Sequence, residues 1–184
     1  MIESIEDDTV LFCSGFRVKE EYNAAYIQKI LEGFGDIVVQ VLDKRFIADA
    51  EHARIILLQA YEAFKRGLYV AKKARVDILL KFLCTKKIES ALRDALPADN
   101  VKEFALAGFG SREKVIEMVK YLESFGVFDE KILEPSNERL EFLIRYHNLS
   151  EDEVKNYGVG KILCDRSAAV FSKYYKLKSS ALTQ

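Results

Sequence analysis

The chain has 184 residues, of which 49% are apolar and 31% charged, and its formal net charge at pH 7 is −1. A chain of this length and apolar content can bury a proper core, so its composition excludes intrinsic disorder and predicts one globular domain over residues 1–184. The acidic start has no signal-peptide character, and no apolar run is long enough to span a bilayer. The three cysteines are widely spaced and predict no disulfide framework. We therefore expect a cytoplasmic protein with no membrane contact.

The first third of the chain predicts two strands and a helix. β-Forming residues are concentrated from Thr9 to Val18, which predicts a strand. Apolar residues at helical spacing over 20–33 predict a helix that ends at Gly33. The run IVVQVLD at 37–43 predicts a second, buried strand.

The stretch from Asp49 to Gly67 has the longest helical periodicity in the chain, with a good capping residue at its start and a glycine at its end. Ile55 and Leu58 fall outside its apolar stripe, so this helix either contacts protein on a second side or presents apolar surface to a partner. Two shorter helices are predicted next, at 74–83 and 87–96.

The second half of the chain predicts a similar mixture of strands and helices. The expected strands are at 101–107 and 131–133. The expected helices are at 111–125, at 137–146, in a short segment that starts at 150 and is broken by the glycines at 158 and 160, and at 161–175. Strands interleaved with long helices predict an α/β (α+β) fold, in which several helices cover a small sheet of about four strands. The last helix completes this domain, and its apolar arc is wider than a small domain needs to bury.

Positive charge is concentrated around the middle of the chain. Eight basic residues stand against one acid between 65 and 87, namely Lys65, Arg66, Lys72, Lys73, Arg75, Lys81, Lys86 and Lys87 against Asp77. Such segregation is typical of a surface that faces a polyanion, and Tyr69 is an aromatic residue nearby for stacking on an unpaired base. The alternative is a pair of solvated turns whose cations complement helix C-termini.

Known catalytic motifs are absent from the sequence. The glycines at 108 and 110 lie between a predicted strand and a predicted helix, as in a phosphate-binding turn, but Glu113 occupies the position of the third glycine and would repel a pyrophosphate. We therefore expect a tight structural turn there; a small-ligand enzyme built around it is the alternative, and binding of a nucleotide would reveal it. No nucleophile is placed beside a base, so the sequence favours a protein that is not an enzyme and needs no cofactor.

The chain has only two histidines, His52 and His147, and neither has a convincing second metal ligand at helical spacing. The sequence therefore predicts no metal site. His52 lies in the first turn of the central helix, where a neutral imidazole bonded to the preceding loop is one interpretation and a contact to RNA is the other.

Several segments, taken in order, resemble a known family. They are IADAEHARIILLQAYEAFKRG at 47–67, VDILLKFLCTKKIESALRDAL at 76–96, ERLEFLIRYHNLS at 138–150 and the C-terminal amphipathic helix. The chain resembles the small kinase-binding subunits of the KEOPS (EKC) complex, the family of the PRPK-binding protein (TPRKB), as a divergent member of archaeal appearance. Archaeal-looking members carry a small-Gly-x-Arg-Gln turn, whereas residues 83–87 here keep the positive charge but have neither the glycine nor the arginine.

This resemblance implies a non-catalytic, regulatory subunit in the assembly that makes N6-threonylcarbamoyladenosine next to the anticodon of tRNA. Such a subunit binds the small atypical kinase/ATPase of the complex directly, meets the threonylcarbamoyl transferase subunit only indirectly, and helps to hold the CCA end of tRNA. The apolar arc of the last helix would bind the kinase, with anchors at Leu163, Val170, Phe171 and Tyr174. The tRNA would contact one positive patch made by two adjacent turns, with Lys72, Lys73, Arg75, Lys86 and Lys87, and also His52. The alternative function is a stand-alone RNA-binding α/β module that uses residues 65–87.

Overall fold

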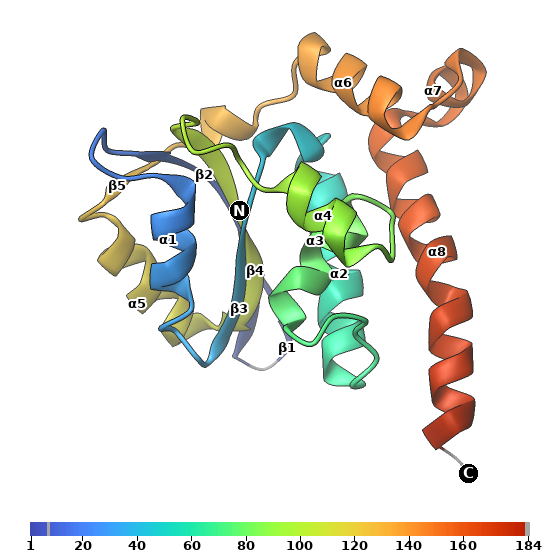
Figure 1. The fold of residues 1–184 in the computed structure, drawn as a ribbon, viewed down its shortest axis with the longest axis horizontal. Coiled ribbons are helices and arrows are strands. Elements are labelled where there is room, and N and C mark those ends of the chain that lie inside the picture. Colours follow the sequence, from blue (N-terminus) through green and yellow to red (C-terminus); the bar gives the residue numbers. More distant parts are fainter. Residues whose placement is uncertain (7, 183–184) are drawn as a thin grey trace.

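The computed structural model describes residues 1–6 and 8–182, and its centre is an antiparallel sheet with helices on both faces (Figure 1). The strands are β1 (Ile2–Glu6), β2 (Thr9–Val18), β3 (Ile37–Leu42), β4 (Glu103–Ser111) and β5 (Gly126–Phe128). Their order is β1-β2-β4-β3, and β5 pairs with the far end of β2, beyond the stretch that β1 occupies. The expected class, a small sheet covered by helices in one α+β domain, is confirmed.

The helices lie between and after the strands along the chain, singly or in groups of three. They are α1 (Ala24–Leu31), α2 (Ala50–Lys65), α3 (Ala74–Phe82), α4 (Ile88–Ala95), α5 (Arg112–Leu122), α6 (Asn137–His147), α7 (Glu151–Tyr157) and α8 (Val159–Leu182), with short 3₁₀ turns η1 (Lys44–Phe46) and η2 (Glu130–Leu133). The predicted caps are present: the side chains of Asp49, Ser111 and Ser150 each accept a hydrogen bond from the first turn of their helix. Among the described residues, no helix is both long enough and apolar enough to cross a membrane.

The sheet separates two hydrophobic cores because successive side chains of a strand point to opposite faces. In β2, Val10 and Phe12 belong to the core under α1 and α5, whereas Leu11 and Cys13 belong to the core under α2, α3 and α4. Figure 1 shows α1 and α5 on one side of the sheet and α2, α3 and α4 on the other, with α8 outermost on that side. The larger core therefore extends through α2 and α3 to α8.

The strand predicted at 131–133 is wrong. These residues belong to η2, because the Asp129 carboxylate accepts a hydrogen bond from the backbone N–H of Lys131 and caps a helical turn. The additional strands are β5, immediately before this turn, and β1 at the start of the chain, and neither was predicted.

The glycines at 108 and 110 do not form a turn either, because β4 continues through them to Ser111. A Cβ at Gly108 would lie 2.0 Å from the carbonyl oxygen of Val38, so this glycine permits close contact with β3. The predicted break between two helices falls at Gly158, which ends α7 with φ 76°. Gly160 is not part of it: this residue lies inside α8, where a Cβ would come 2.8 Å from a carboxylate oxygen of Asp49.

Candidate nucleic-acid and partner interfaces

Half of the basic residues in the 65–87 segment are used in contacts within the chain. Their ion pairs are Lys65 with Glu6, Arg66 with Glu62, Arg75 with Glu32, and Lys81 with Asp77. The other four, Lys72, Lys73, Lys86 and Lys87, are exposed, and they form no ion pair with the residues that the structure describes. Only these four offer uncompensated positive charge to an external anion.

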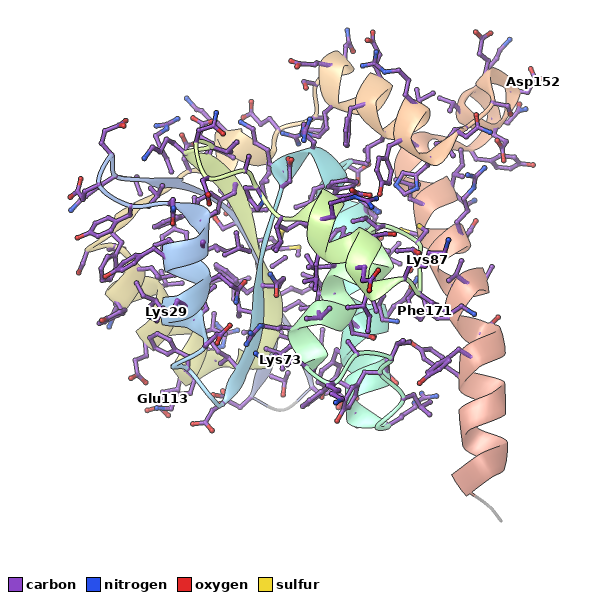
Figure 2. The ribbon with its side chains drawn as sticks, viewed as in Figure 1. Lys29, Lys73, Lys87, Glu113, Asp152 and Phe171 are labelled. Carbon is purple, nitrogen blue, oxygen red and sulfur yellow. The ribbon has the colours of Figure 1, made fainter. Side chains whose placement is uncertain are left out.

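The four exposed lysines form two separate groups. Lys72 and Lys73 precede α3, whereas Lys86 and Lys87 follow it, and a nine-residue helix rises about 13 Å. Figure 2 labels Lys73 and Lys87 at the two ends of this part of the molecule. The expectation of one continuous patch is therefore wrong, because the intervening residues fold into α3 and separate the two turns.

The turn between α3 and α4 has a regular helix-terminating geometry. Cys84 adopts a left-handed conformation with φ 49°, and the N–H groups of Thr85 and Cys84 donate to the carbonyls of Leu80 and Lys81 at 3.0 and 3.1 Å. Glycine is the usual residue in this conformation, so a cysteine here carries a cost of roughly 1 kcal/mol. The turn thus keeps the backbone shape that a glycine would favour.

A cavity of about 540 Å³ lies beside this turn and is called the turn cavity below. Residues far apart in the sequence line it, including Thr85, Ser90, Tyr146, His147, Arg166 and Val170. Lys86 and Lys87 directly follow Thr85, and Lys87 is the N-cap residue of α4, whose side chain cannot accept a capping hydrogen bond. The start of α4 and the backbone of the two lysines therefore lie close to the lining of the turn cavity, although neither lysine lines it.

The polar groups of the turn cavity are held by internal hydrogen bonds. Arg166 donates to the carbonyl of His147 at 2.7 Å and to the carboxylate of Glu153 at 3.0 Å. Tyr146 donates its hydroxyl to Asp94 at 2.8 Å; burial and this bond raise the pKa of Tyr146 to about 12. Burial, and then the nearby Arg166 charge, lower the pKa of His147 to about 4. The cavity thus combines an exposed tyrosine ring, a guanidinium and a neutral imidazole.

Tyr146 and Arg166 were not predicted as site residues. Each comes from a different helix, α6 and α8, and only the folded chain brings them to the turn between α3 and α4. No local spacing in the sequence signals such a combination.

His52 contacts the chain's own loop, so the predicted RNA contact is wrong. Its side chain is 1% exposed, and Nδ1 accepts a hydrogen bond from the N–H of Ala48 at 3.1 Å. Burial lowers the pKa of His52 to about 4, which keeps the imidazole neutral. The ring packs edge-on against Phe82, with centroids 5.5 Å apart, and is part of the core between α2 and α3.

The predicted kinase anchors on α8 divide into two kinds. Leu163 is fully buried and Phe171 is 1% exposed, so both belong to the core against α2 and α3, and the expectation that they are available to a partner is wrong. Val170 and Tyr174 keep part of their surface exposed. The apolar arc is wide because α8 covers the outside of two helices of its own domain.

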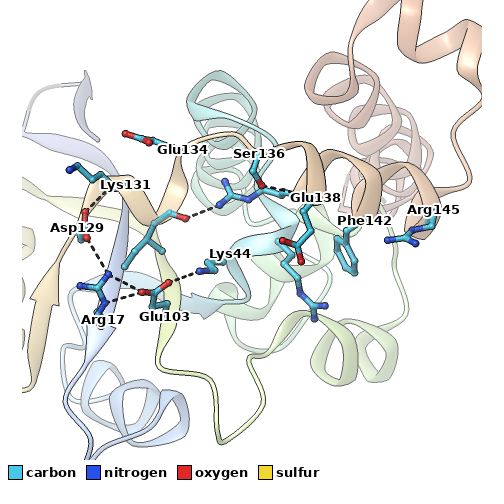
Figure 3. Close-up of a pocket in the computed structure, with 13 residues that line it drawn as sticks. Arg17, Lys44, Glu103, Asp129, Lys131, Glu134, Ser136, Glu138, Phe142 and Arg145 are labelled. Carbon is cyan, nitrogen blue, oxygen red and sulfur yellow. Dashed lines mark hydrogen bonds and ion pairs between the residues drawn. The ribbon is translucent and has the colours of Figure 1, made fainter.

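A second hollow, of about 610 Å³, lies at one end of the sheet (Figure 3). Its charges are mostly satisfied within the chain: Arg17 and Lys44 both pair with Glu103, at 2.9 and 2.6 Å. The buried guanidinium of Arg139 donates to the carbonyls of Ile132 and Leu133 at 2.7 and 2.8 Å. The bonds of Arg139 fasten α6 to η2, and the Glu103 carboxylate compensates two of the cations in the lining.

Within the described part of the chain, no three side chains of the metal-binding types lie close enough together to hold an ion. Comparison of the chain with protein-family models and with curated protein sequences gives no match.

Proposed function

We propose that this chain is a non-catalytic adaptor subunit of a KEOPS-type complex. It binds the small kinase/ATPase subunit directly and helps to recruit the CCA end of tRNA for threonylcarbamoyladenosine modification. The family resemblance described above supports this proposal. The structural observation that carries it is the turn cavity, which has an aromatic ring in its lining and adjoins the turn that carries Lys86 and Lys87, two exposed lysines with no ion pair among the described residues.

The turn cavity has the features that single-stranded RNA requires. Proteins hold unpaired nucleotides by stacking bases on aromatic rings and by placing cations along the phosphates. The ring of Tyr146 supplies the stacking surface, and Lys86 and Lys87 supply the cations. The uncapped start of α4 adds backbone N–H donors for a phosphate. A volume of about 540 Å³ lies within the range of small-ligand sites, so it accommodates a terminal nucleotide.

The kinase contact is assigned to the outer side of α8 at the partly exposed Tyr174, one turn after Val170, which is partly exposed where it lines the turn cavity. An aromatic residue on a rigid helix is a typical centre of a protein interface. Because Leu163 and Phe171 fix the inner side of α8 to the core, the outer side is presented without a folding step.

RNA binding tests the proposed site by comparing two matched charge reversals. The variant Lys86→Glu/Lys87→Glu should weaken binding of a short RNA ending in CCA at least tenfold. The variant Lys72→Glu/Lys73→Glu makes the same charge change at the other end of α3 and should change RNA binding less than threefold. Tyr146→Ala should lose roughly 1–3 kcal/mol, the usual contribution of one stacked base. Fluorescence anisotropy at fixed salt measures all three. Equal losses in the two double variants would reject the turn cavity as the site.

Kinase binding requires a separate experiment. The tagged chain should capture a small kinase from its native cell extract, and the capture should survive ribonuclease treatment. Tyr174→Glu should abolish it, whereas Lys161→Glu, an exposed substitution on the same helix, should not. Capture of RNA without a kinase would refute the adaptor role and favour the stand-alone RNA-binding module.

A further inference from the structure

A third cavity, of about 360 Å³, lies between α2 and α8 and is called the α2–α8 cavity. Most of its lining is apolar, contributed by Leu58, Ala63, Leu68, Ala168 and Phe171. Lys81 and Tyr175 also line it. An apolar hollow of this size with a few convergent polar groups is the usual form of a small-molecule site.

Lys81 is an unusual member of such a lining because its side chain is only 1% exposed. Its Nζ lies 3.7 Å from Oδ2 of Asp77 and 3.9 Å from the centre of the Phe171 ring, and it is hydrogen-bonded to the hydroxyl of Tyr175. Asp77 uses Oδ1 to accept the N–H of Val70 at 2.7 Å, while Oδ2 has no hydrogen-bond partner among the described residues. A buried amine, a carboxylate with a free lone pair and a phenol thus meet at one point.

Burial favours a partly neutral amine at Lys81, and its charged neighbours oppose this only in part. Burial lowers the pKa of Lys81 to about 8, against the opposing attraction of Asp77 on α3. On α2, Glu62 and Arg66 pair with each other at 2.7 Å, and on α8 Tyr175 stays neutral because burial raises its pKa. At pH 7.5, roughly a quarter of the Lys81 side chains are then neutral, and a neutral amine is the nucleophilic form.

We propose that the α2–α8 cavity binds a small apolar aldehyde and that Lys81 forms an imine with it. The nitrogen of Lys81 adds to the carbonyl carbon, and the carbonyl oxygen then leaves as water with the two hydrogens of the amine. The new C=N bond replaces the C=O bond, so no oxidant or reductant is needed. Asp77 Oδ2 and the Tyr175 hydroxyl are placed to carry protons between nitrogen and oxygen during this exchange.

The same surroundings suit the product. A protonated imine is a cation centred on the atom that carried the ammonium charge, so Asp77 and the face of the Phe171 ring stabilise it in the same way. The apolar lining of the cavity holds the carbon body of the aldehyde and limits the access of water, which would hydrolyse the imine.

Reductive trapping tests this proposal on the intact protein. The chain is incubated with benzaldehyde and cyanoborohydride at pH 7.5, and the benzylated lysines are located by peptide mass mapping. Lys81 should be labelled at least tenfold faster than the exposed Lys72 and Lys87. Its labelling rate should rise with pH, reach half of its maximum near pH 8 and level off above that pH.

Two neighbouring substitutions on α8 provide the control. Ala168 lines the α2–α8 cavity and Ala169 lines the turn cavity, and both are exposed. Ala168→Trp should slow the labelling of Lys81 at least tenfold, and Ala169→Trp should leave it unchanged, with both variants melting close to the parent protein. Labelling of Lys81 no faster than that of the exposed lysines, or equal labelling in both tryptophan variants, would overturn the proposal.

Discussion

The strongest test of the structure is the removal of the Phe171 ring, because this residue joins α8 to the rest of the domain. The ring is 1% exposed, contacts the ammonium of Lys81 and belongs to the core shared with α2 and α3. Truncation of a buried phenylalanine to alanine costs about 3–5 kcal/mol, and loss of the contact with Lys81 adds to it. For a chain of this size, 1 kcal/mol lowers Tm by roughly 2–4 °C, so Phe171→Ala should lower Tm by about 6–20 °C.

Thermal unfolding followed by circular dichroism measures this effect directly. Tyr174→Ala is the matched control, since its ring lies on the same helix but keeps part of its surface in solvent, and its expected cost is about 1 kcal/mol. If Phe171→Ala lowered Tm no more than Tyr174→Ala, α8 would not be part of the core. Phe171→Glu would be no test of kinase binding, because it buries a carboxylate in the core and would disrupt the packing of α8 itself.

Two further predictions concern the histidines and the sheet. The pKa values of His52 and His147 in the native protein are lowered to about 4. Between pH 6.5 and 4 the unfolded chain therefore binds more protons than the native one, so the free energy of unfolding falls as pH decreases. The buried His52 alone accounts for a loss of about 3 kcal/mol. With only two histidines in the chain, NMR should show neither imidazole titrating above pH 5, and a midpoint near 6.5 for His52 would contradict its burial. Gly108→Ala should lower the free energy of unfolding in urea by more than 2 kcal/mol, because its Cβ would meet the backbone of β3. The control is Gly35→Ala, whose Cβ meets nothing within 4 Å and which should change stability by less than 1 kcal/mol. Equal effects of the two substitutions would disprove the β3–β4 register.

Local signals were sufficient for the long elements of this fold. The cap at Asp49 and the apolar period after it predicted α2 almost to the residue, and the apolar run at 37–43 predicted β3. Short elements were not predictable in this way. Ile132 is buried like a strand residue, yet it lies in a 3₁₀ turn because the Asp129 carboxylate caps that turn at Lys131. The short strand β5 is identifiable only from its pairing with β2.

The candidate site was less predictable because charge compensation is a property of the folded chain. Lys65 is neutralised by Glu6 and Arg75 by Glu32, and neither partner is close in sequence. The basic segment therefore overstated the charge available to RNA, and α3 separated what remained into two groups. Conversely, Tyr146 and Arg166 carried no local signal and reached the site only through the packing of α6 and α8.

The two proposed surfaces meet on α8. Val170 lines the turn cavity and also lies next to the buried Phe171, while Tyr174 follows one turn later on the same helix. A kinase bound to the outer side of α8 would thus lie next to the RNA end held at the turn between α3 and α4. Since Phe171 and Lys81 fix α8 to α3, this arrangement is set by the core before either partner binds. An adaptor needs such pre-organisation, because positions held by the core cost no ordering entropy when the partners bind.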